Sequence, residues 1–335
     1  MFKGKTILVT GGTGSIGSEI VRQLLKYEPK AIRIFSRGEE KQFYMQQELS
    51  TYSNVRFLIG DVRDYQRVEY ACRDVDIIFH AAAMKHVPAS EYNPMEAVKT
   101  NVVGTQNVID AAIRNDVKKF VGISTDKVVS PTNTMGATKL LSEKLIIAAN
   151  QYKGKTKTVF SCVRFGNVMG SSGSVIPLFC KQLESGKDIT LTDENMTRFM
   201  MSIPQAAKLV LSAAINSKFG ETYVLKMPSI KISVLAKTLL DHYNETHESK
   251  YQGEIKVVGL RPGEKLYEEL MSPDEISRSY ENDKMYIIPP NHHAVDARYE
   301  EYEKIKITTY SSDDTKMMTE EGFLNTVKEN NLVGW

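Results

Sequence analysis

The stretch Thr10-Gly11-Gly12-Thr13-Gly14-Ser15-Ile16-Gly17 joins an apolar segment, Thr6–Thr10, to an amphipathic segment, Ser18–Lys26. A strand, a glycine-rich turn and a helix in this order are typical of a dinucleotide-binding Rossmann unit. Gly11 permits the tight turn, Gly14 lets the backbone approach a pyrophosphate, and Gly17 allows close helix packing. A glycine-rich turn without a ligand is the plainer interpretation, but the flanking strand and helix disfavour it. Thr13, Ser15 and Ile16 are expected at the same site.

The first half of the chain alternates predicted strands and helices, which favours a parallel sheet. Further strands are expected at Ala31–Phe35, Val55–Ile59, Asp76–Ala81, Lys119–Ser124 and Thr158–Arg164, and helices at Gln66–Ala71, Pro94–Asn115 and Thr134–Gln151. This order predicts an α/β fold with a Rossmann-type, doubly wound parallel sheet.

The residues after the second predicted strand, Phe35-Ser36-Arg37-Gly38-Glu39-Glu40-Lys41, indicate which dinucleotide is bound. Ser36, Arg37 and Lys41 suit a ribose 2′-phosphate, because no carboxylate directly follows the strand to hold a free 2′-hydroxyl. NADP is therefore expected rather than NAD, although a solvated surface cation is the plainer interpretation of Arg37. Two further segments complete the expected cofactor site: Asp61-Val62 and Ala81-Ala82-Ala83.

After Arg164 the pattern loosens into the glycine- and serine-rich run 166–174, with helices expected near Val175–Ser185 and Pro204–Ser217. We therefore divide the chain into an NADP-binding Rossmann domain, 1–165, to which 203–226 return, and a smaller, mainly C-terminal substrate-binding cap, 166–202 and 227–335. The cap includes a C-terminal tail that is expected to wrap the body or a neighbouring subunit.

The segment Ser124-Thr125-Asp126-Lys127 and the later Met135-Gly136-Ala137-Thr138-Lys139 resemble the active site of a short-chain dehydrogenase in which the usual catalytic tyrosine is replaced by Met135. A tyrosine four residues before a lysine could transfer a proton, whereas the thioether of Met135 cannot. Asp126 and Lys127 are therefore the candidate acid and base. An exposed ion pair, worth about 0 to 1 kcal/mol, is the plainer interpretation, but the flanking motifs favour a site. Met135 itself is expected to pack in the helix.

Several motifs spread over nearly the whole chain support one family. They are the glycine-rich turn, Asp61-Val62, Ala81-Ala82-Ala83-Met84-Lys85-His86-Val87-Pro88, Ser124-Thr125-Asp126-Lys127, Arg164-Phe165-Gly166-Asn167-Val168 and Arg261-Pro262-Gly263-Glu264-Lys265. Together they resemble the extended short-chain dehydrogenase/reductase superfamily. Within it they resemble the UDP-N-acetylglucosamine 4,6-dehydratases that invert carbon 5 and serve capsule, O-antigen and flagellar glycan synthesis. Met135 departs from the tyrosine of most members and resembles the capsule-type branch.

The resemblance implies transient oxidation of carbon 4 of the sugar by NADP, loss of the carbon 5 proton and the carbon 6 hydroxyl, and return of the hydride to carbon 6. Lys127 is then the expected base and Asp126 the expected acid. Thr125 is expected to bond the carbon 4 hydroxyl, which Asp126 or a water would deprotonate, and Lys139 to bond the nicotinamide ribose. Repulsion from Lys139 and the oxidised nicotinamide is expected to keep Lys127 partly neutral.

Substrate binding is expected from residues of the loops and the cap. Arg261, before the turn Pro262-Gly263 and a helix starting at Glu264, suits a diphosphate, and Asn167 suits a sugar or phosphate oxygen. The Gly170–Ser174 loop leading into Val175 resembles the segment that covers the nucleotide. Arg198 is a weaker second cation, and Lys85 with His86 is expected to support the site. Surface arginines are the plainer interpretation of the cations.

Composition restricts the partners. The net charge of +2 gives no reason to expect nucleic acid or an anionic membrane surface. Cys72, Cys162 and Cys180 lack zinc-ligand spacing and predict reduced thiols and a cytoplasmic protein. No signal peptide or apolar run of about 20 residues is apparent, so no membrane span is expected. His292-His293 lacks a matching ligand cluster, so no metal site is expected.

Two other functions stay open at this point. A carbon 4 epimerase acting on the same UDP-sugar would follow if Asp126 does not act as an acid. A noncatalytic NADPH-sensing module would follow if Met135 marks lost chemistry. The expected substrate in the leading interpretation is UDP-N-acetylglucosamine, and the resemblance implies a homo-oligomer, with a hexamer as the candidate assembly.

Overall fold

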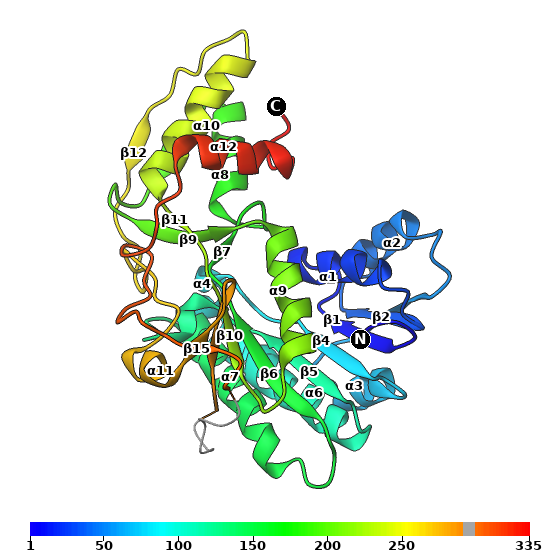
Figure 1. The fold of residues 1–335 in the computed structure, drawn as a ribbon. Helices are drawn as coiled ribbons and strands as arrows, with labels where there is room; N and C mark the ends of the chain where they lie inside the picture. The colour runs from blue at the N-terminus through cyan, green and yellow to red at the C-terminus, as the bar shows by residue number, and fades with distance from the viewer. Residues whose placement is uncertain (291–298) are drawn as a thin grey trace.

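The computed structural model describes residues 1–290 and 299–335, and a ten-stranded sheet forms its body (Figure 1). Seven neighbouring strands of this sheet pair in parallel: β3 (Val55–Ile59), β2 (Ala31–Ser36), β1 (Thr6–Thr10), β4 (Ile77–His80), β5 (Lys119–Ile123), β6 (Val159–Arg164) and β10 (Thr222–Leu225). Three antiparallel strands extend it beyond β10: β14 (Met285–Ile288), β13 (Tyr280–Glu281) and β15 (Glu303–Lys304). The predicted doubly wound α/β fold is confirmed.

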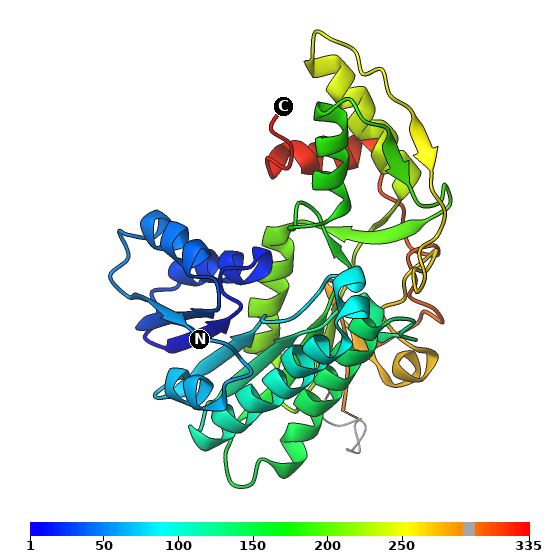
Figure 2. The ribbon, with the colours of Figure 1, turned by 180° about the vertical axis from the view of Figure 1, so that it is seen from behind.

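Helices cover both faces of the parallel sheet. One face carries α1 (Ser15–Leu25), α2 (Glu39–Glu48) and α9 (Ile203–Asn216), whose apolar side chains share one core with β1 and β2. The other face carries α3 (Tyr65–Cys72), α6 (Gly104–Arg114) and α7 (Thr134–Tyr152), which are seen across the sheet in Figure 2. Because β4 lies on the opposite side of β1 from β2, the loops after β1 and β4 diverge and leave a crevice at the carboxyl ends of the strands.

The predicted helix Pro94–Asn115 is divided. It consists of α5 (Pro94–Ala97), a π-helical turn called η1 (Val98–Val103) and α6. A single π turn within an α-helix is frequent at functional sites, because it turns a side chain out of the regular register. The short helix α4 (Val87–Tyr92) precedes this helix, and a 3₁₀ turn called η2 (Asp126–Val128) follows β5.

The cap lies beyond the carboxyl ends of the strands, at the top of Figure 1. It contains a sheet in the order β11 (Ser229–Lys231), β9 (Thr197–Met201) and β7 (Asn167–Val168), and a strand pair, β12 (Ile255–Val257) with β8 (Ile189–Leu191). Its helices are α8 (Val175–Glu184), α10 (Ile232–Thr246) and α12 (Glu320–Glu329), and they pack around a separate apolar core. The small helix α11 (Pro273–Arg278) lies beside the body.

The predicted division of the chain differs from the structure in two segments, 280–288 and 303–304. The strands β13, β14 and β15 fall within 227–335, which the sequence predicts as cap, but they extend the large sheet: β14 pairs with β10, β13 with β14, and β15 with β13. Residues 203–226 supply α9, which packs on α1, and β10, which pairs with β6. His292 and His293 lie outside the described residues.

Candidate active site

A cavity of about 460 Å³ opens at the carboxyl ends of β1 to β4. Ten of the predicted cofactor residues line it: Gly11, Thr13, Gly14, Ser36, Arg37, Lys41, Asp61, Val62, Ala81 and Ala82. The remaining four do not line the cavity: Ser15, Ile16 and Gly17 begin α1, and Lys139 lies on α7. The structure therefore brings together residues from four separate loops that were proposed on sequence grounds to hold one dinucleotide.

The glycine-rich turn has the shape that a pyrophosphate requires. Gly11 has φ +66°, and a Cβ atom there would lie 2.7 Å from the backbone nitrogen of Ala82. A Cβ at Gly17 would lie 2.3 Å from the carbonyl oxygen of Gly11, which accounts for the close helix packing. Gly14 is the N-cap of α1 and offers no side chain to the first amide groups of the helix. Those donors suit an anionic ligand, so these residues fit a dinucleotide.

The expected 2′-phosphate site lies at the edge of this cavity. The Ser36 hydroxyl oxygen accepts hydrogen bonds from Gln42 Nε2 at 2.9 Å and from the Thr13 hydroxyl at 3.1 Å. The side chain of Arg37 is 58% exposed and lies 3.8 Å from Asp61, whose closer partner is Arg63 at 2.7 Å. Because its own contact with Asp61 is long, the Arg37 guanidinium can turn toward a phosphate placed at the cavity mouth.

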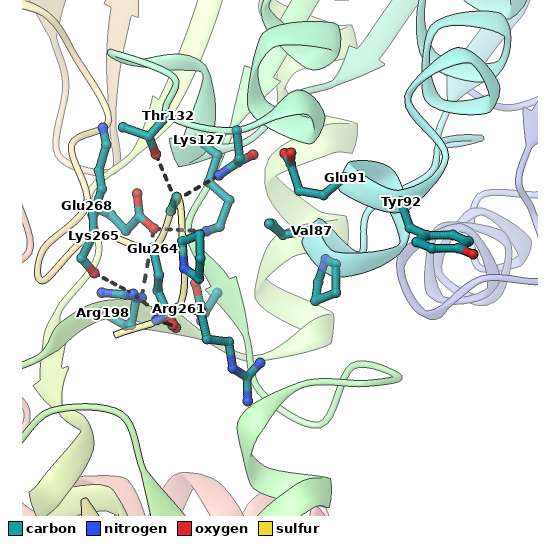
Figure 3. A pocket seen from close by; sticks show the side chains of 15 residues that line it. Val87, Glu91, Tyr92, Lys127, Thr132, Arg198, Arg261, Glu264, Lys265 and Glu268 are labelled. Carbon is teal, nitrogen blue, oxygen red and sulfur yellow. Dashed lines mark hydrogen bonds and ion pairs between the residues drawn. The ribbon is translucent and has the colours of Figure 1, made fainter. Parts of the chain in front are cut away.

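A second cavity, of about 650 Å³, lies between the body and the cap (Figure 3). Five predicted site residues line it: Lys127, Asn167, Arg198, Arg261 and Glu264. Val87, Glu91 and Tyr92 from α4 form the side opposite Lys127 and Glu268. Lys85 and Val175 line neither cavity, since Lys85 is exposed on its loop and Val175 packs against the cap core.

The loop of residues 170–174, expected to cover the nucleotide, contacts both sides of the crevice. The amide of Ser172 donates to the Ser15 hydroxyl at 3.2 Å, next to the glycine-rich turn. His86 packs against Gly173, where a Cβ atom would lie 2.4 Å from the imidazole. The loop therefore lies beside the first turn of α1, and His86 supports it from the body.

Arg261 belongs to a tight turn, and the helix predicted to start at Glu264 is absent. The Glu264 amide donates to the Arg261 carbonyl at 3.0 Å, which closes the turn over Pro262 and Gly263. No helix begins at Glu264, and the next described helix is α11, which begins at Pro273. The Gly263 carbonyl accepts from the Thr132 hydroxyl at 2.8 Å, which ties the turn to the segment that precedes α7. The side chain of Arg261 points away from Lys127 in Figure 3 and is exposed.

Arg198 is a buried cation whose donors are largely used by the protein. Its guanidinium donates to the carbonyl oxygens of Thr197 at 2.7 Å, Lys265 at 2.8 Å and Leu266 at 3.1 Å. It also lies 3.9 Å from the carboxylate of Glu268. These contacts fix the 261–268 segment against β9, so Arg198 shapes the cavity wall.

The side chains of Asp126 and Lys127 meet in η2. Lys127 Nζ lies 3.1 Å from Asp126 Oδ1, and the Thr125 hydroxyl donates to the same oxygen at 2.7 Å. Lys127 Nζ also lies 3.2 Å from Oε1 of Glu268, a residue that the sequence motifs did not single out. Neither predicted residue turns to bulk solvent: Lys127 lines the large cavity, and Asp126 is buried behind it.

These contacts change the expected electrostatics of Lys127. Burial alone would lower the pKa of Lys127, but the charges of Asp126 and Glu268 outweigh burial, and the net effect raises that pKa. The prediction that repulsion from Lys139 keeps Lys127 partly neutral is therefore wrong for the protein without ligands. Lys127 needs a nearby group that accepts its proton before it can act as a base.

Lys139 and Met135 lie on α7, and Asn101 of the neighbouring turn η1, which the sequence did not predict as a site residue, bonds to the same helix. Lys139 Nζ donates to the carbonyl of Ile123 at 2.6 Å, and burial lowers its pKa. Asn101 in the π turn donates to the Thr138 hydroxyl at 3.0 Å, between Met135 and Lys139. The one signal in the sequence that could have indicated Asn101 is that it is a polar residue within a predicted helix. Met135 is buried, as its expected packing role requires.

Two kinds of site receive no support from the described residues. None of the helices within 1–290 and 299–335 is both long and apolar enough to span a membrane. Within the same ranges, no three His, Cys, Asp or Glu side chains gather as a metal site would require.

Comparison with known proteins identifies one family, whose members carry different names. The family described as "Polysaccharide biosynthesis protein" matches residues 7–290. An uncharacterised membrane protein of Methanocaldococcus jannaschii is 50% identical over 98% of this chain and 96% of its own. A UDP-N-acetylglucosamine 4,6-dehydratase (inverting) of Campylobacter jejuni is 48% identical over 88% of this chain and 86% of its own. A UDP-glucose 4-epimerase of Rickettsia bellii is 43% identical over 98% of this chain and 96% of its own length.

One solved structure covers the whole fold. The X-ray structure of Pen from Bacillus thuringiensis superposes with a TM-score of 0.94 at 45% identity, and the match covers 99% of each chain. The agreement therefore includes the cap as well as the Rossmann body.

Proposed function

Because this chain belongs to the polysaccharide biosynthesis protein family, we propose that it is an NADP-dependent UDP-N-acetylglucosamine 4,6-dehydratase that inverts carbon 5. Its relatives are sugar-nucleotide dehydratases and epimerases of the extended short-chain dehydrogenase/reductase type. The product would be a UDP-2-acetamido-2,6-dideoxy-4-hexulose for capsule, O-antigen or related glycans. Relatives that carry the dehydratase name support this substrate.

The residues that would hold NADP line the smaller cavity. When bound, NADP accepts a hydride from carbon 4 of the sugar and supplies it again at carbon 6. The amide groups at the start of α1 would bind the pyrophosphate, and Arg37, with Lys41 and Ser36, would bind the 2′-phosphate. Asp61 and Val62 would lie at the adenine, with Ala81 and Ala82 along the dinucleotide.

The observation that carries the dehydratase proposal is the position of Lys127 between two buried carboxyl groups at the cavity wall. Oxidation at carbon 4 acidifies the proton on carbon 5, and dehydration then needs a base for that proton and an acid for the carbon 6 hydroxyl. Lys127 is the proposed base, and one of its two carboxyl partners is the proposed acid. Simple epimerisation at carbon 4 needs neither group in these roles.

Thr125 and Lys139 keep their proposed places beside carbon 4 and the nicotinamide ribose. The Thr125 hydroxyl already donates to Asp126, so it would offer an acceptor oxygen or exchange this bond for one to the substrate. The short bond from Lys139 to Ile123 fixes the ammonium at the end of β5, where the nicotinamide half of the cofactor would lie.

Arg261 and Asn167 are the proposed contacts for the UDP part of the substrate. Both line the large cavity, and Arg261 is free to make a bidentate contact with a phosphate. Arg198 and Glu264 would act by fixing the wall, since each contacts neighbouring protein groups. The three cysteines are buried and unpaired, which supports a reducing compartment such as the cytoplasm. The homo-oligomer stays a prediction of the resemblance.

A UDP-sugar 4-epimerase is the second candidate function, because Rickettsia relatives of similar identity carry that name. The two functions differ in whether water is lost. We would incubate the purified protein with UDP-N-acetylglucosamine and catalytic NADP and analyse the products by mass spectrometry and proton NMR. A dehydratase gives a product lighter by one water with a methyl signal at carbon 6. An isomer of unchanged mass would identify the epimerase, and unchanged substrate would contradict both.

A further inference from the structure

Glu268 is a buried carboxyl group at the wall of the large cavity, and it touches the proposed base directly. Its Oε1 lies 3.2 Å from Lys127 Nζ and 3.9 Å from Arg198 Nε (Figure 3). Only 3% of its surface is exposed. Asp126 contacts the same ammonium at 3.1 Å, and Glu264 lies 4.0 Å from Arg198. Asp126 and Glu268 both contact Lys127 and are therefore the two candidates for the acid.

The two carboxyl groups differ in their access to the cavity. Asp126 Oδ1 accepts from both the Thr125 hydroxyl and Lys127, and Asp126 lines neither cavity. Glu268 lines the large cavity. The second oxygen of each group, Asp126 Oδ2 and Glu268 Oε2, is buried without a hydrogen-bond partner among the described residues, but only Glu268 is placed to meet a substrate in the cavity. A buried oxygen without a partner is unfavourable, and a bound proton or a substrate hydroxyl would relieve this cost.

The surroundings of Glu268 also favour its protonated form. Burial, followed by the charge of Asp126, raises the pKa of Glu268, while Lys127 and Arg198 act in the opposite direction without cancelling the rise. The Glu268 backbone is fixed by Ser312, whose hydroxyl accepts from the Glu268 amide at 3.0 Å and whose amide donates to the Glu268 carbonyl at 2.9 Å. Glu268 is thus a positioned carboxyl group that can hold a proton.

We propose that Glu268, rather than Asp126, gives the proton to the departing hydroxyl of carbon 6. This inference rests on the proposed function. With substrate bound, a proton moves from Lys127 Nζ to Glu268 Oε1, which leaves an amine beside a carboxylic acid. The amine takes the proton from carbon 5, the electron pair of that bond forms the carbon 5–carbon 6 double bond, and the carbon 6–oxygen bond breaks. The Glu268 proton joins the leaving oxygen, water departs, and the ammonium–carboxylate pair is restored.

This order of proton transfers explains how Lys127 can act as a base although its pKa is raised. One proton transfer over a contact of 3.2 Å creates the base and the acid together, with no net charge added to the buried site. Asp126 keeps its contact of 3.1 Å with Lys127 Nζ and stabilises the ammonium that forms when Lys127 takes the carbon 5 proton. Its place behind Lys127 suits that role.

The test compares Glu268→Gln, Asp126→Asn and the control Glu269→Gln, which makes the same chemical change at the next residue, outside both cavities. Each variant is assayed with UDP-N-acetylglucosamine and with its 6-deoxy-6-fluoro analogue, whose fluoride needs less protonation to leave. Glu268→Gln is expected to slow water loss by about 10²-fold or more, whereas it slows fluoride release far less. Glu268→Asp should recover much of the reaction with the natural substrate, and Glu269→Gln should behave as wild type.

Three results would overturn the assignment. Equal loss with both substrates would mean a structural role, and unchanged water loss in Glu268→Gln would exclude the acid role. Selective rescue by fluoride in Asp126→Asn alone would return the role to Asp126. Melting temperatures and NADP binding identify a variant that does not fold, and in that case Glu268→Asp decides through its ratio of water loss to fluoride release. Failure of the proposed function is separate, because the wild-type protein would then release neither water nor fluoride.

Discussion

Met135 lies one helical turn before Lys139 on α7, and both side chains are buried, with 4 and 8% of their surfaces exposed. The lysine therefore has no phenol beside it on that helix face, and the thioether fills the space. A methionine in this position can supply volume but no proton.

The first prediction concerns Met135. Met135→Leu keeps the volume and is expected to cost less than about 1.5 kcal/mol of stability while most of the activity remains. Met135→Ala opens a cavity and should cost roughly 2 to 5 kcal/mol. Chemical denaturation and product NMR measure both effects. A leucine variant that melts normally but makes no product would show that the sulfur atom itself takes part.

The second prediction concerns Lys127→Arg. Arginine keeps the positive charge between Asp126 and Glu268, so the fold and NADP binding should be retained, but its guanidinium cannot be deprotonated to act as a base. Dehydration is expected to fall by about 10² to 10⁴-fold. Lys144→Arg, at an exposed position of α7, is the matched control. Substantial turnover by Lys127→Arg would assign the base to another residue.

The third prediction concerns the choice of dinucleotide. Replacing Arg37 and Lys41 by alanine should weaken NADP binding by about 10-fold or more while NAD binding changes little, because only the 2′-phosphate contacts are lost. Dissociation constants for both cofactors, measured by calorimetry, give the ratio. Arg73→Ala removes a surface arginine that pairs with Glu69 and should leave the ratio unchanged. Equal weakening for the two dinucleotides would mean that Arg37 and Lys41 do not read the 2′-phosphate.

The fourth prediction concerns acid stability. The carboxylate of Glu275 accepts two hydrogen bonds from Arg164, at 2.7 and 2.8 Å. Burial alone would raise the pKa of Glu275, but these bonds outweigh burial and lower the pKa from 4.5 to about 2. A lowered carboxyl pKa stabilises the fold above the unfolded value of 4.5, and this stability is lost as the pH falls from 4.5 toward about 2.

Glu275→Gln should therefore cost roughly 3 kcal/mol at neutral pH and flatten the fall of stability between pH 4.5 and about 2. Denaturation at several pH values measures this. Asp274→Asn, at a side chain that is 79% exposed, should change little. If both variants show the same pH dependence as wild type, the ion pair of Arg164 with Glu275 does not contribute to acid stability.

The sequence predicted the Rossmann body well because its strands are short apolar runs with clear ends, as at Thr6–Thr10. The helix α2 was not predicted, since its segment is polar and only Gln42 and Met45 are buried, so no helical repeat of apolar residues is visible. The helix expected after Gly263 is a turn instead. The antiparallel strands β14 and β13 depend on the pairing of β14 with β10 and of β13 with β14, which a local pattern does not reveal.

The candidate site could be predicted in part for a similar reason. Residues that follow strand ends, such as Gly11, Arg37 and Lys127, were found because a parallel sheet brings those ends together. Glu268 was missed because its contact with Lys127 depends on how a cap segment returns to the body. Nothing local separates Glu268 from Glu264 or Glu269 in the sequence. Only the fold shows which of them is buried against Lys127.

The central claim is most directly tested by following the hydrogen on carbon 4. UDP-N-acetylglucosamine labelled with deuterium at carbon 4 would be converted in ordinary water, and unlabelled substrate in deuterium oxide. We expect the carbon 4 label to appear at carbon 6 of the product, and one solvent deuterium to appear at carbon 5. Label that stays at or returns to carbon 4, with no solvent deuterium at carbon 5, would contradict the proposal.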